Sequence, residues 1–221
     1  MNYLGHKGVA TATLPLILFP KEVLSLFNIQ GYNNSIFNIS SYLIDFSNNF
    51  ISIINQHPFV FIFSIMSYWI GSTFIDFIDF KIIKKLMSKE KQKSQFYYHR
   101  QWTHALIDNI LYFYLSIYFL YHTENIYFYI IVFYFLGVFT HLLADMITGS
   151  IPIFFYGHYA KKMSRIGIDR FIPTSKTTFF TKTLPKYFDR LSFLFFIFGV
   201  VLFFYFGGND MILQPLLSSI F

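Results

Sequence analysis

Residues 126 to 147 read IYFYIIVFYFLGVFTHLLADMI, an apolar run interrupted near its end by His141 and Asp145. A helix of this length spans the roughly 30 Å hydrocarbon core of a bilayer. A His and an Asp four residues apart on a helix project from the same face, about one turn or ~6 Å apart along the axis. Ionisable groups at membrane depth cost about 3 kcal/mol each, so this pair predicts a functional site.

The same pattern occurs once more, upstream. Residues 103 to 108 read THALID and residues 140 to 145 read THLLAD, so His104 and Asp108 repeat the spacing of the first pair. We expect the two segments to pack as an antiparallel hairpin with a tight turn at residues 122–125. That packing would gather all four ionisable side chains into one cluster.

Composition places the chain among integral membrane proteins. Hydrophobic residues make up 55% and charged residues 13% of the 221 residues, as in chains that bury most of their surface in lipid. The absence of cysteine excludes disulfides, thiolate metal sites and a cysteine nucleophile. The length predicts one domain over residues 1–221, with a motif-bearing core at 5–157, a basic cytoplasmic loop at 158–190 and a final span at 191–207.

Four apolar stretches are long enough, or nearly so, to cross a membrane: Pro58–Ile75, Ala105–Tyr121, Ile126–Ile147 and Leu191–Gly207. A fifth stretch, Val9–Phe27, contains two prolines and a Lys-Glu pair, so it is either a kinked span or an interfacial helix. The expected fold class is all-α: a polytopic membrane helical bundle with four to five spans and a metal cluster at its cytoplasmic end.

Lysine and arginine predict the orientation of these spans. Seven lie between Lys81 and Arg100 and eight lie between Lys161 and Arg190, and the positive-inside rule places both segments in the cytoplasm. Residues 28–57 contain no Lys or Arg, which predicts an external loop and favours a crossing at residues 9–27. Topology alone explains the basic loops, and anionic lipid headgroups are the additional partner that we expect.

This topology places six candidate metal ligands at the cytoplasmic ends of the helices: His6, Asp76, His99, His104, His141 and Asp145. Imidazole and carboxylate ligands suit Zn(II), with Mn(II) or Fe(II) as alternatives. Arg100 offers a planar donor fork for phosphate. Thr103 is a candidate N-cap, which would put His104 in the first helical turn.

Five further ionisable residues have less certain roles in this scheme. Asp108 either supports the cluster or pairs with one of its histidines. Asp79 either faces the cluster or ends a helix in the headgroup region. His158 is expected to be solvated rather than a ligand, and His57 and His122 are expected on the opposite surface.

Three segments carry a resemblance: Gly5-His6, residues 99–104 (HRQWTH) and residues 137–148 (GVFTHLLADMIT). Together they resemble the family of membrane-bound metal-dependent hydrolases, some of which are described as regulated by the SOS repressor. That family is similar in motif layout to the zinc-dependent phospholipases C and the zinc-dependent single-strand nucleases. The resemblance covers most of residues 5–157, and it implies the same six ligands and a place in the bacterial inner membrane.

The chain departs from the family pattern at one element. The family usually has Pro-Asp-x-Asp after a glycine, whereas residues 71–79 read GSTFIDFID, without proline and with the second acid displaced. Asp76 therefore matches the pattern and Asp79 does not. Asp108 has no counterpart in the family pattern.

The resemblance and the location of the site imply hydrolysis of a phosphoester or phosphodiester, with a lipid-linked substrate favoured. One or two metals would lower the pKa of bound water toward ~7. Asp76 or Asp145 would bridge the metals and orient that water, and Arg100 would stabilise charge on the phosphate oxygens. Lys161 or Lys162 would steer an anionic headgroup.

Three alternatives remain open from the sequence. A metal or proton transporter would continue its polar residues across the bilayer, whereas residues 112–121 and 126–135 contain no ionisable group except tyrosine. A non-catalytic membrane protein would use the His/Asp cluster to hold its bundle together. A nuclease is compatible with the basic loops, although they lack the interleaved aromatic residues of a strand-binding groove.

Overall fold

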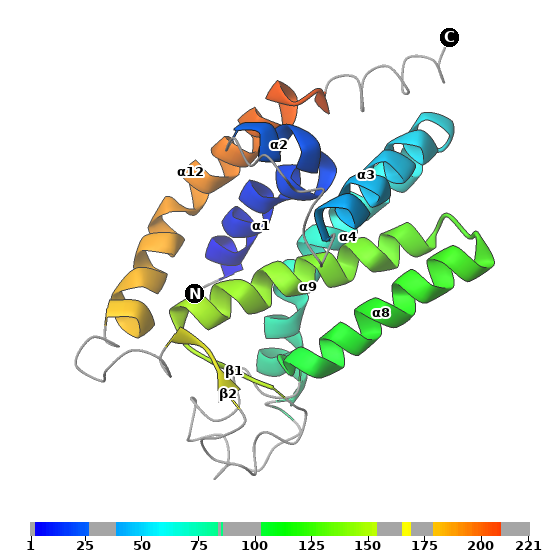
Figure 1. Cartoon of the computed structure of the whole chain (residues 1–221). Helices are drawn as coiled ribbons and strands as arrows, with labels where there is room; N and C mark the ends of the chain where they lie inside the picture. The colour runs from blue at the N-terminus through cyan, green and yellow to red at the C-terminus, as the bar shows by residue number, and fades with distance from the viewer. Residues whose placement is uncertain are drawn as a thin grey trace.

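The computed structural model describes residues 3–26, 39–83, 85, 103–153, 165–168 and 179–208. This part of the chain is helical except for one two-stranded antiparallel sheet, so the all-α class is confirmed (Figure 1). Its elements are α1 (Tyr3–Leu18), α2 (Pro20–Leu26), α3 (Ile39–Gln56), α4 (Pro58–Phe77), the π-helix η1 (Ile78–Ile83), α8 (Leu106–Thr123), α9 (Phe128–Thr148), β1 (Ile151–Pro152), β2 (Arg165–Ile166), the π-helix η3 (Phe179–Thr183) and α12 (Leu184–Tyr205).

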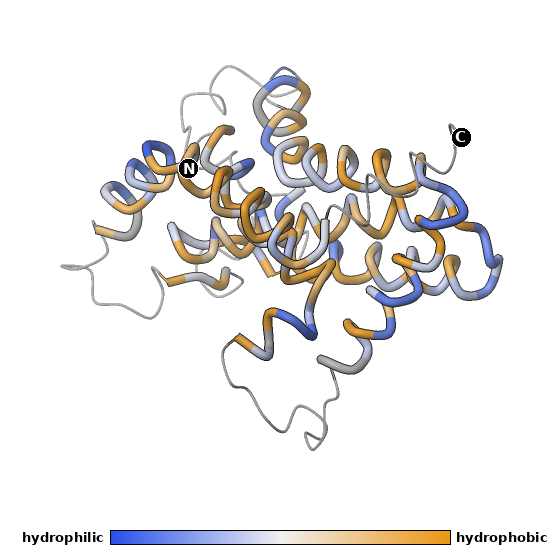
Figure 2. The backbone as a smooth tube through the Cα atoms, turned by 90° about the horizontal axis from the view of Figure 1, so that it is seen from above, coloured by the Kyte–Doolittle hydropathy of each residue, from blue (hydrophilic) through white to orange (hydrophobic). Residues whose placement is uncertain are grey.

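Among the described residues, three helices are long and apolar enough to cross a membrane: α4, α9 and α12. Figure 2 shows apolar residues along most of the helical path, with hydrophilic residues gathered at several turns and helix ends. Three of the predicted spans fall on these helices. The last of them starts earlier than predicted, because α12 begins at Leu184 and continues directly from η3.

The other two predicted spans are helical but do not reach the length and hydropathy of a candidate span. The stretch predicted at 105–121 corresponds to α8, whose first turns contain Asp108 and Asn109 and whose later turns contain four tyrosines. The stretch at 9–27 is divided between α1, which has 16 residues, and α2. Pro20 has no N–H to continue the helical ladder, so the helix breaks there.

Residues 28–57 were predicted to form an external loop, and for the described part of this segment the prediction of a loop is wrong. Residues Ile39–Gln56 form α3, an amphipathic helix of 18 residues. Its buried face carries Ser47, Phe50 and Ile54 at helical spacing, while Asn48 and Asn49 are exposed. The lack of basic residues predicted location and not conformation, so the 3.6-residue period within a polar segment was missed.

Glycines let two pairs of helices approach closely. A Cβ atom at Gly71 of α4 would overlap the carbonyl oxygen of Tyr134 in α9, and one at Gly137 of α9 would overlap the carbonyl oxygen of Tyr68 in α4. Gly199 of α12 meets the backbone of α1 in the same way. Small residues at such contacts permit the close backbone packing that holds membrane helices together.

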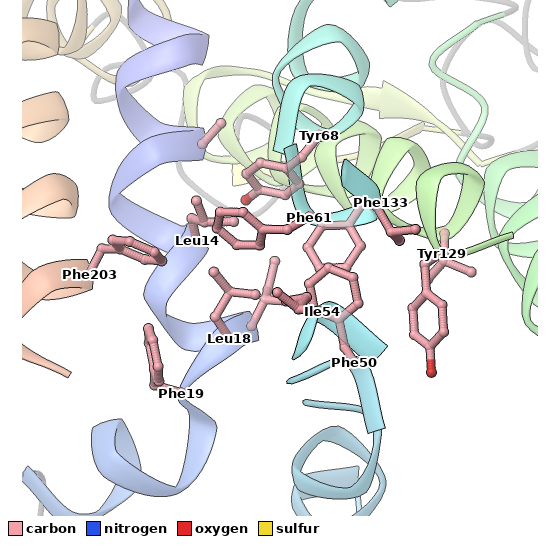
Figure 3. Packing of buried hydrophobic residues seen from close by; sticks show 14 of the residues in the cluster. Leu14, Leu18, Phe19, Phe50, Ile54, Phe61, Tyr68, Tyr129, Phe133 and Phe203 are labelled. Carbon is pink, nitrogen blue, oxygen red and sulfur yellow. The ribbon is translucent and has the colours of Figure 1, made fainter. Parts of the chain in front are cut away.

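The main hydrophobic core lies at one end of the α4–α9 pair. Phe50 of α3, Phe61 of α4 and Phe133 of α9 are buried together, and side chains of α1 and α12 complete the cluster (Figure 3). The ring centroids of Phe50 and Phe133 are 4.5 Å apart. A second, smaller cluster of buried apolar residues lies toward the other end of the pair: Ile75, Val138, Leu142 and Ile151.

The hairpin of α8 and α9 determines which residues meet at that second end. Glu124 adopts a left-handed conformation (φ 52°) after α8, and the Asn125 side chain accepts a hydrogen bond from the Tyr127 N–H at 3.0 Å. The two helices run side by side from this turn (Figure 1). The start of α8 therefore lies beside the end of α9, where β1 follows.

Candidate metal centre

Five of the six predicted metal ligands come together at the end of the bundle opposite the aromatic core. They are His6 of α1, Asp76 of α4, His104 in the turn before α8, and His141 and Asp145 of α9. His104, His141 and Asp145 have no exposed surface, His6 is 1% exposed and Asp76 is 8% exposed. Two overlapping sets of these residues have nitrogen and oxygen atoms close enough to hold a metal ion: His6, Asp76 and His141, and His104, His141 and Asp145.

The ring of His141 is oriented by a backbone carbonyl of the neighbouring helix. Its Nδ1 lies 2.7 Å from the carbonyl oxygen of Ser72. A carbonyl only accepts hydrogen bonds, so Nδ1 donates its proton and Nε2 of the neutral ring is left with its lone pair facing the cluster. Histidines that bind metals are commonly fixed in this way through the nitrogen that does not bind.

The ring of His104 is oriented by the side chain before it. Its Nδ1 lies 3.0 Å from Oγ1 of Thr103, and its Nε2 lies 3.0 Å from Nε2 of His141. If both rings turn lone pairs toward each other, a contact this short requires a cation between them. A proton on Nε2 of His104 is the other way to satisfy the pair.

The two carboxylates divide their oxygens between the histidines. Oδ1 of Asp76 and Oδ2 of Asp145 each lie 3.4 Å from Nε2 of both His104 and His141. The other oxygens face His6, whose Nε2 lies 3.6 Å from Oδ2 of Asp76 and 3.7 Å from Oδ1 of Asp145. Each carboxylate thus turns one oxygen toward the pair of histidines and the other toward His6.

These distances fit the coordination shell of a metal ion. Zinc binds imidazole nitrogen and carboxylate oxygen at about 2.0–2.2 Å, which puts neighbouring ligand atoms of a tetrahedron roughly 3.3–3.6 Å apart. The four distances from Nε2 of His104 and His141 to the two carboxylate oxygens are 3.4 Å, within this range, and the two Nε2 atoms lie closer together, at 3.0 Å. The donor set of imidazole and carboxylate also suits a divalent transition metal, so the residues present fit such an ion.

His6 is held by stacking. Its ring lies against that of His141 with centroids 3.7 Å apart and planes 16° apart. Burial, and then the neighbouring His141, lower the pKa of His6 well below its usual value, so the ring is neutral. Both of its nitrogens are buried and make no hydrogen bond to the described residues. A neutral, buried imidazole is in the form that binds metals.

The remaining predicted residues have different outcomes. His99, Arg100, His158, Lys161 and Lys162 lie outside the described residues, and so does the side chain of Asp79, whose backbone belongs to η1. Asp108 belongs to neither candidate metal group. His57 and His122 are exposed, as expected for surface residues.

Thr103 does not have the role that was predicted for it. The N-cap of α8 is Ala105, and no side chain caps the helix through a hydrogen bond. His104 therefore lies in the turn before the helix and not in its first turn. The Thr103 hydroxyl is used instead by the His104 ring.

Two partners of the ligands were missed from the sequence. The Ser72 carbonyl is a backbone group, and no residue type signals that it will meet His141. Thr103 was interpreted as a helix cap. The repeated Thr-His gave no signal for its contact with the ring, because in the second copy the Thr140 hydroxyl donates to the Gly137 carbonyl at 2.7 Å.

Comparison with known proteins gives a family for the chain. Searches of the curated proteins and of the solved structures gave no match. The family model described as YdjM inner membrane protein matches residues 56–220, a region that includes Asp76, His104, His141 and Asp145 and excludes His6. Since this region covers most of the chain, the protein belongs to the YdjM inner membrane protein family.

Proposed function

We propose that the protein is a membrane-bound metal-dependent hydrolase that cleaves a phosphoester or phosphodiester bond. The observation that carries this proposal is the convergence of three histidines and two carboxylates inside an apolar bundle, with the His–Asp pairs and the His104–His141 pair separated by 3.0 to 3.7 Å. Five ionisable side chains from four segments of the chain are buried this deeply only at a cost, which a functional role explains. The motif resemblance to metal-dependent hydrolases supplies the reaction class.

The oxygens of the two carboxylates suggest how the metal is held. His104, His141, one oxygen of Asp76 and one of Asp145 would hold one ion. His6 and the two other carboxylate oxygens would provide part of a second site. We favour zinc, with manganese or iron as alternatives. Such an ion, when bound, supplies Lewis acidity and lowers the pKa of water toward ~7.

The chain's own residues have separate tasks in this reaction. Asp76 has the only partly exposed side chain of the five, at 12%, so substrate and water would reach the centre past this carboxylate. Asp76 and Asp145 would orient the attacking water by accepting its hydrogen bonds. We keep Arg100 as the group that stabilises the charge on the phosphate oxygens, because an arginine fork fits that geometry.

The substrate class follows from where the cluster lies along the helices. Asp76 and Asp145 stand within the last turns of α4 and α9, two candidate membrane spans. A lipid presents its phosphate at the corresponding depth, near the end of the hydrocarbon region. The positive-inside rule applied to the basic segments puts this end of the bundle in the cytoplasm.

A conduit for ions is disfavoured by the packing on the other side of the cluster. The aromatic core of Phe50, Phe61 and Phe133 fills the bundle there. A structural metal centre is the second candidate, because the complete burial of His104, His141 and Asp145 is also typical of closed structural sites.

Metal analysis of the full chain in detergent tests the proposal. We expect stoichiometric zinc, manganese or iron by mass spectrometry in the wild type and in the exposed-histidine control His122→Ala, and loss of the metal in His141→Ala and Asp145→Ala. A screen of phosphoester and phospholipid substrates then follows with the same four proteins. Metal without hydrolysis of any substrate would favour the structural centre, and a well-folded wild type without metal after reconstitution would refute the site.

A further inference from the structure

The segment that carries His104 is a turn and not a helix. Thr103 and His104 form this turn, and Ala105 follows with extended backbone angles as the N-cap of α8. The other ligands lie on helices, whose hydrogen-bonded backbone fixes their direction. A ligand on a turn needs an additional contact to fix its position to the same degree.

Asn109 provides that contact from inside α8. Its Nδ2 donates to the carbonyl oxygen of Thr103 at 2.9 Å and to that of Ala105 at 2.8 Å. These two residues flank His104 in the chain. One side-chain amide therefore donates to the carbonyl groups of the residues before and after the ligand.

The surroundings make these two hydrogen bonds hard to replace. Asn109 is 8% exposed and Ala105 has no exposed surface, so little water reaches the amide. The Ala105 carbonyl also accepts the Asn109 backbone N–H at 3.2 Å, which ties the turn to the first hydrogen bond of the helix. Loss of a donor to a buried carbonyl is costly unless water or another group replaces it.

We propose that Asn109 is the positioning residue for the metal ligand His104. This inference rests on the proposed metal centre, to which Asn109 adds a group that binds no metal itself. Nε2 of His104 must stay 3.0 Å from Nε2 of His141 and 3.4 Å from one oxygen of each carboxylate to complete the ligand set. A displacement of about 1 Å removes a group from a site of this kind.

A double-mutant cycle tests the inference in the full chain. Zn²⁺ affinity is measured in detergent by competition with a chromophoric chelator, for the wild type, Asn109→Leu, His104→Ala and the double variant. We expect Asn109→Leu to weaken Zn²⁺ binding 10- to 100-fold, the range found when a partner of a metal ligand is removed. In the His104→Ala protein, the same change should have no further effect, because Asn109 acts through that ring.

A matched control comes from the same face of α8. Ser116 is also buried, at 4% exposed, lies seven residues after Asn109 and donates one hydrogen bond to the Phe113 carbonyl at 2.7 Å. Ser116→Ala should keep the wild-type affinity. If Asn109→Leu does not fold, Asn109→Asp takes its place, because it keeps the size of the side chain and removes both donors.

Each result decides a separate point. Wild-type Zn²⁺ affinity in a folded Asn109 variant would overturn the positioning role and leave the metal centre intact. An equal loss in the presence and absence of His104 would show a general structural role for Asn109 and would also overturn the inference. A wild type that binds no Zn²⁺ would contradict the metal centre itself, and the inference with it.

Discussion

The two ends of the α4–α9 pair bury different kinds of side chain. At the end where both helices begin, Phe61 and Phe133 belong to a large aromatic core to which α1, α3 and α12 also contribute. At the end where both helices finish, the buried apolar cluster is small, and Asp76, His141 and Asp145 occupy the space between the helices. Gly71 and Gly137 bring the two backbones together between these ends.

This difference separates stability from function within one pair of helices. The aromatic end buries large side chains, and burial of such surface is the main favourable term in packing. The ligand end has little apolar surface to bury, so its cohesion depends on polar contacts and on the cation that the ligands would hold. A substitution at the ligand end can therefore leave the aromatic end intact. A substitution at the close contact of Gly71 and Gly137 should disturb both ends.

Gly137→Leu should have the largest effect, because it disturbs both ends. The new side chain would start where the carbonyl oxygen of Tyr68 now lies, so the backbones must separate. We expect the free energy of unfolding to fall by on the order of 5 kcal/mol, which is at the upper end for one substitution, and we expect the metal to be lost. Thermal unfolding in detergent measures it, with Val201→Leu on the exposed face of α12 as control. Unchanged unfolding would contradict the close approach.

Phe133→Ala should affect the aromatic end alone. Phe133 has no exposed surface and lies 4.5 Å from Phe50 between ring centroids. Removing such a ring leaves a cavity and costs about 3–5 kcal/mol of unfolding free energy. We expect the metal content per folded molecule to remain that of the wild type. Loss of metal from folded Phe133→Ala protein would show that the two ends are coupled.

Removal of the metal should affect the ligand end alone. A ligand present at a hundred times its dissociation constant stabilises a protein by about 2.7 kcal/mol. A chelator should therefore lower the free energy of unfolding of the wild type by about that amount, which appears as a lower unfolding temperature. In His141→Ala, the chelator should have no effect. Equal shifts in the two proteins would place the cation elsewhere.

The aromatic end illustrates how far the sequence predicts the fold. Long apolar runs predicted helices at α4 and α9, because burial and length leave few alternatives in a membrane. The helix α3 was missed because its apolar residues are mixed with serines and asparagines. They form one buried face only when the residues are placed at helical spacing. The two prolines of residues 9–27 left a kinked span or an interfacial helix open, and the structure has the break at Pro20 while Pro15 lies inside α1.

At the ligand end, the sequence predicted which side chains meet but not how they are held. His6, Asp76, His104, His141 and Asp145 are costly in an apolar chain, and that cost made them conspicuous. Asp108 was equally unusual in an apolar segment, yet it belongs to neither metal group. The Ser72 carbonyl and the Asn109 amide depend on tertiary contacts that no spacing encodes.

Thr103→Val should have the smallest effect of the series and should sharpen the difference between a ligand and its support. Valine keeps the shape of threonine but removes the oxygen 3.0 Å from Nδ1 of His104, so the ring is free to rotate while its backbone stays in place. We expect about tenfold weaker Zn²⁺ binding, equivalent to ~1.4 kcal/mol, and wild-type affinity in Thr103→Ser, which keeps the hydroxyl. Isothermal titration would detect both. Equal affinities in the valine and serine variants would mean that the turn alone orients the ring.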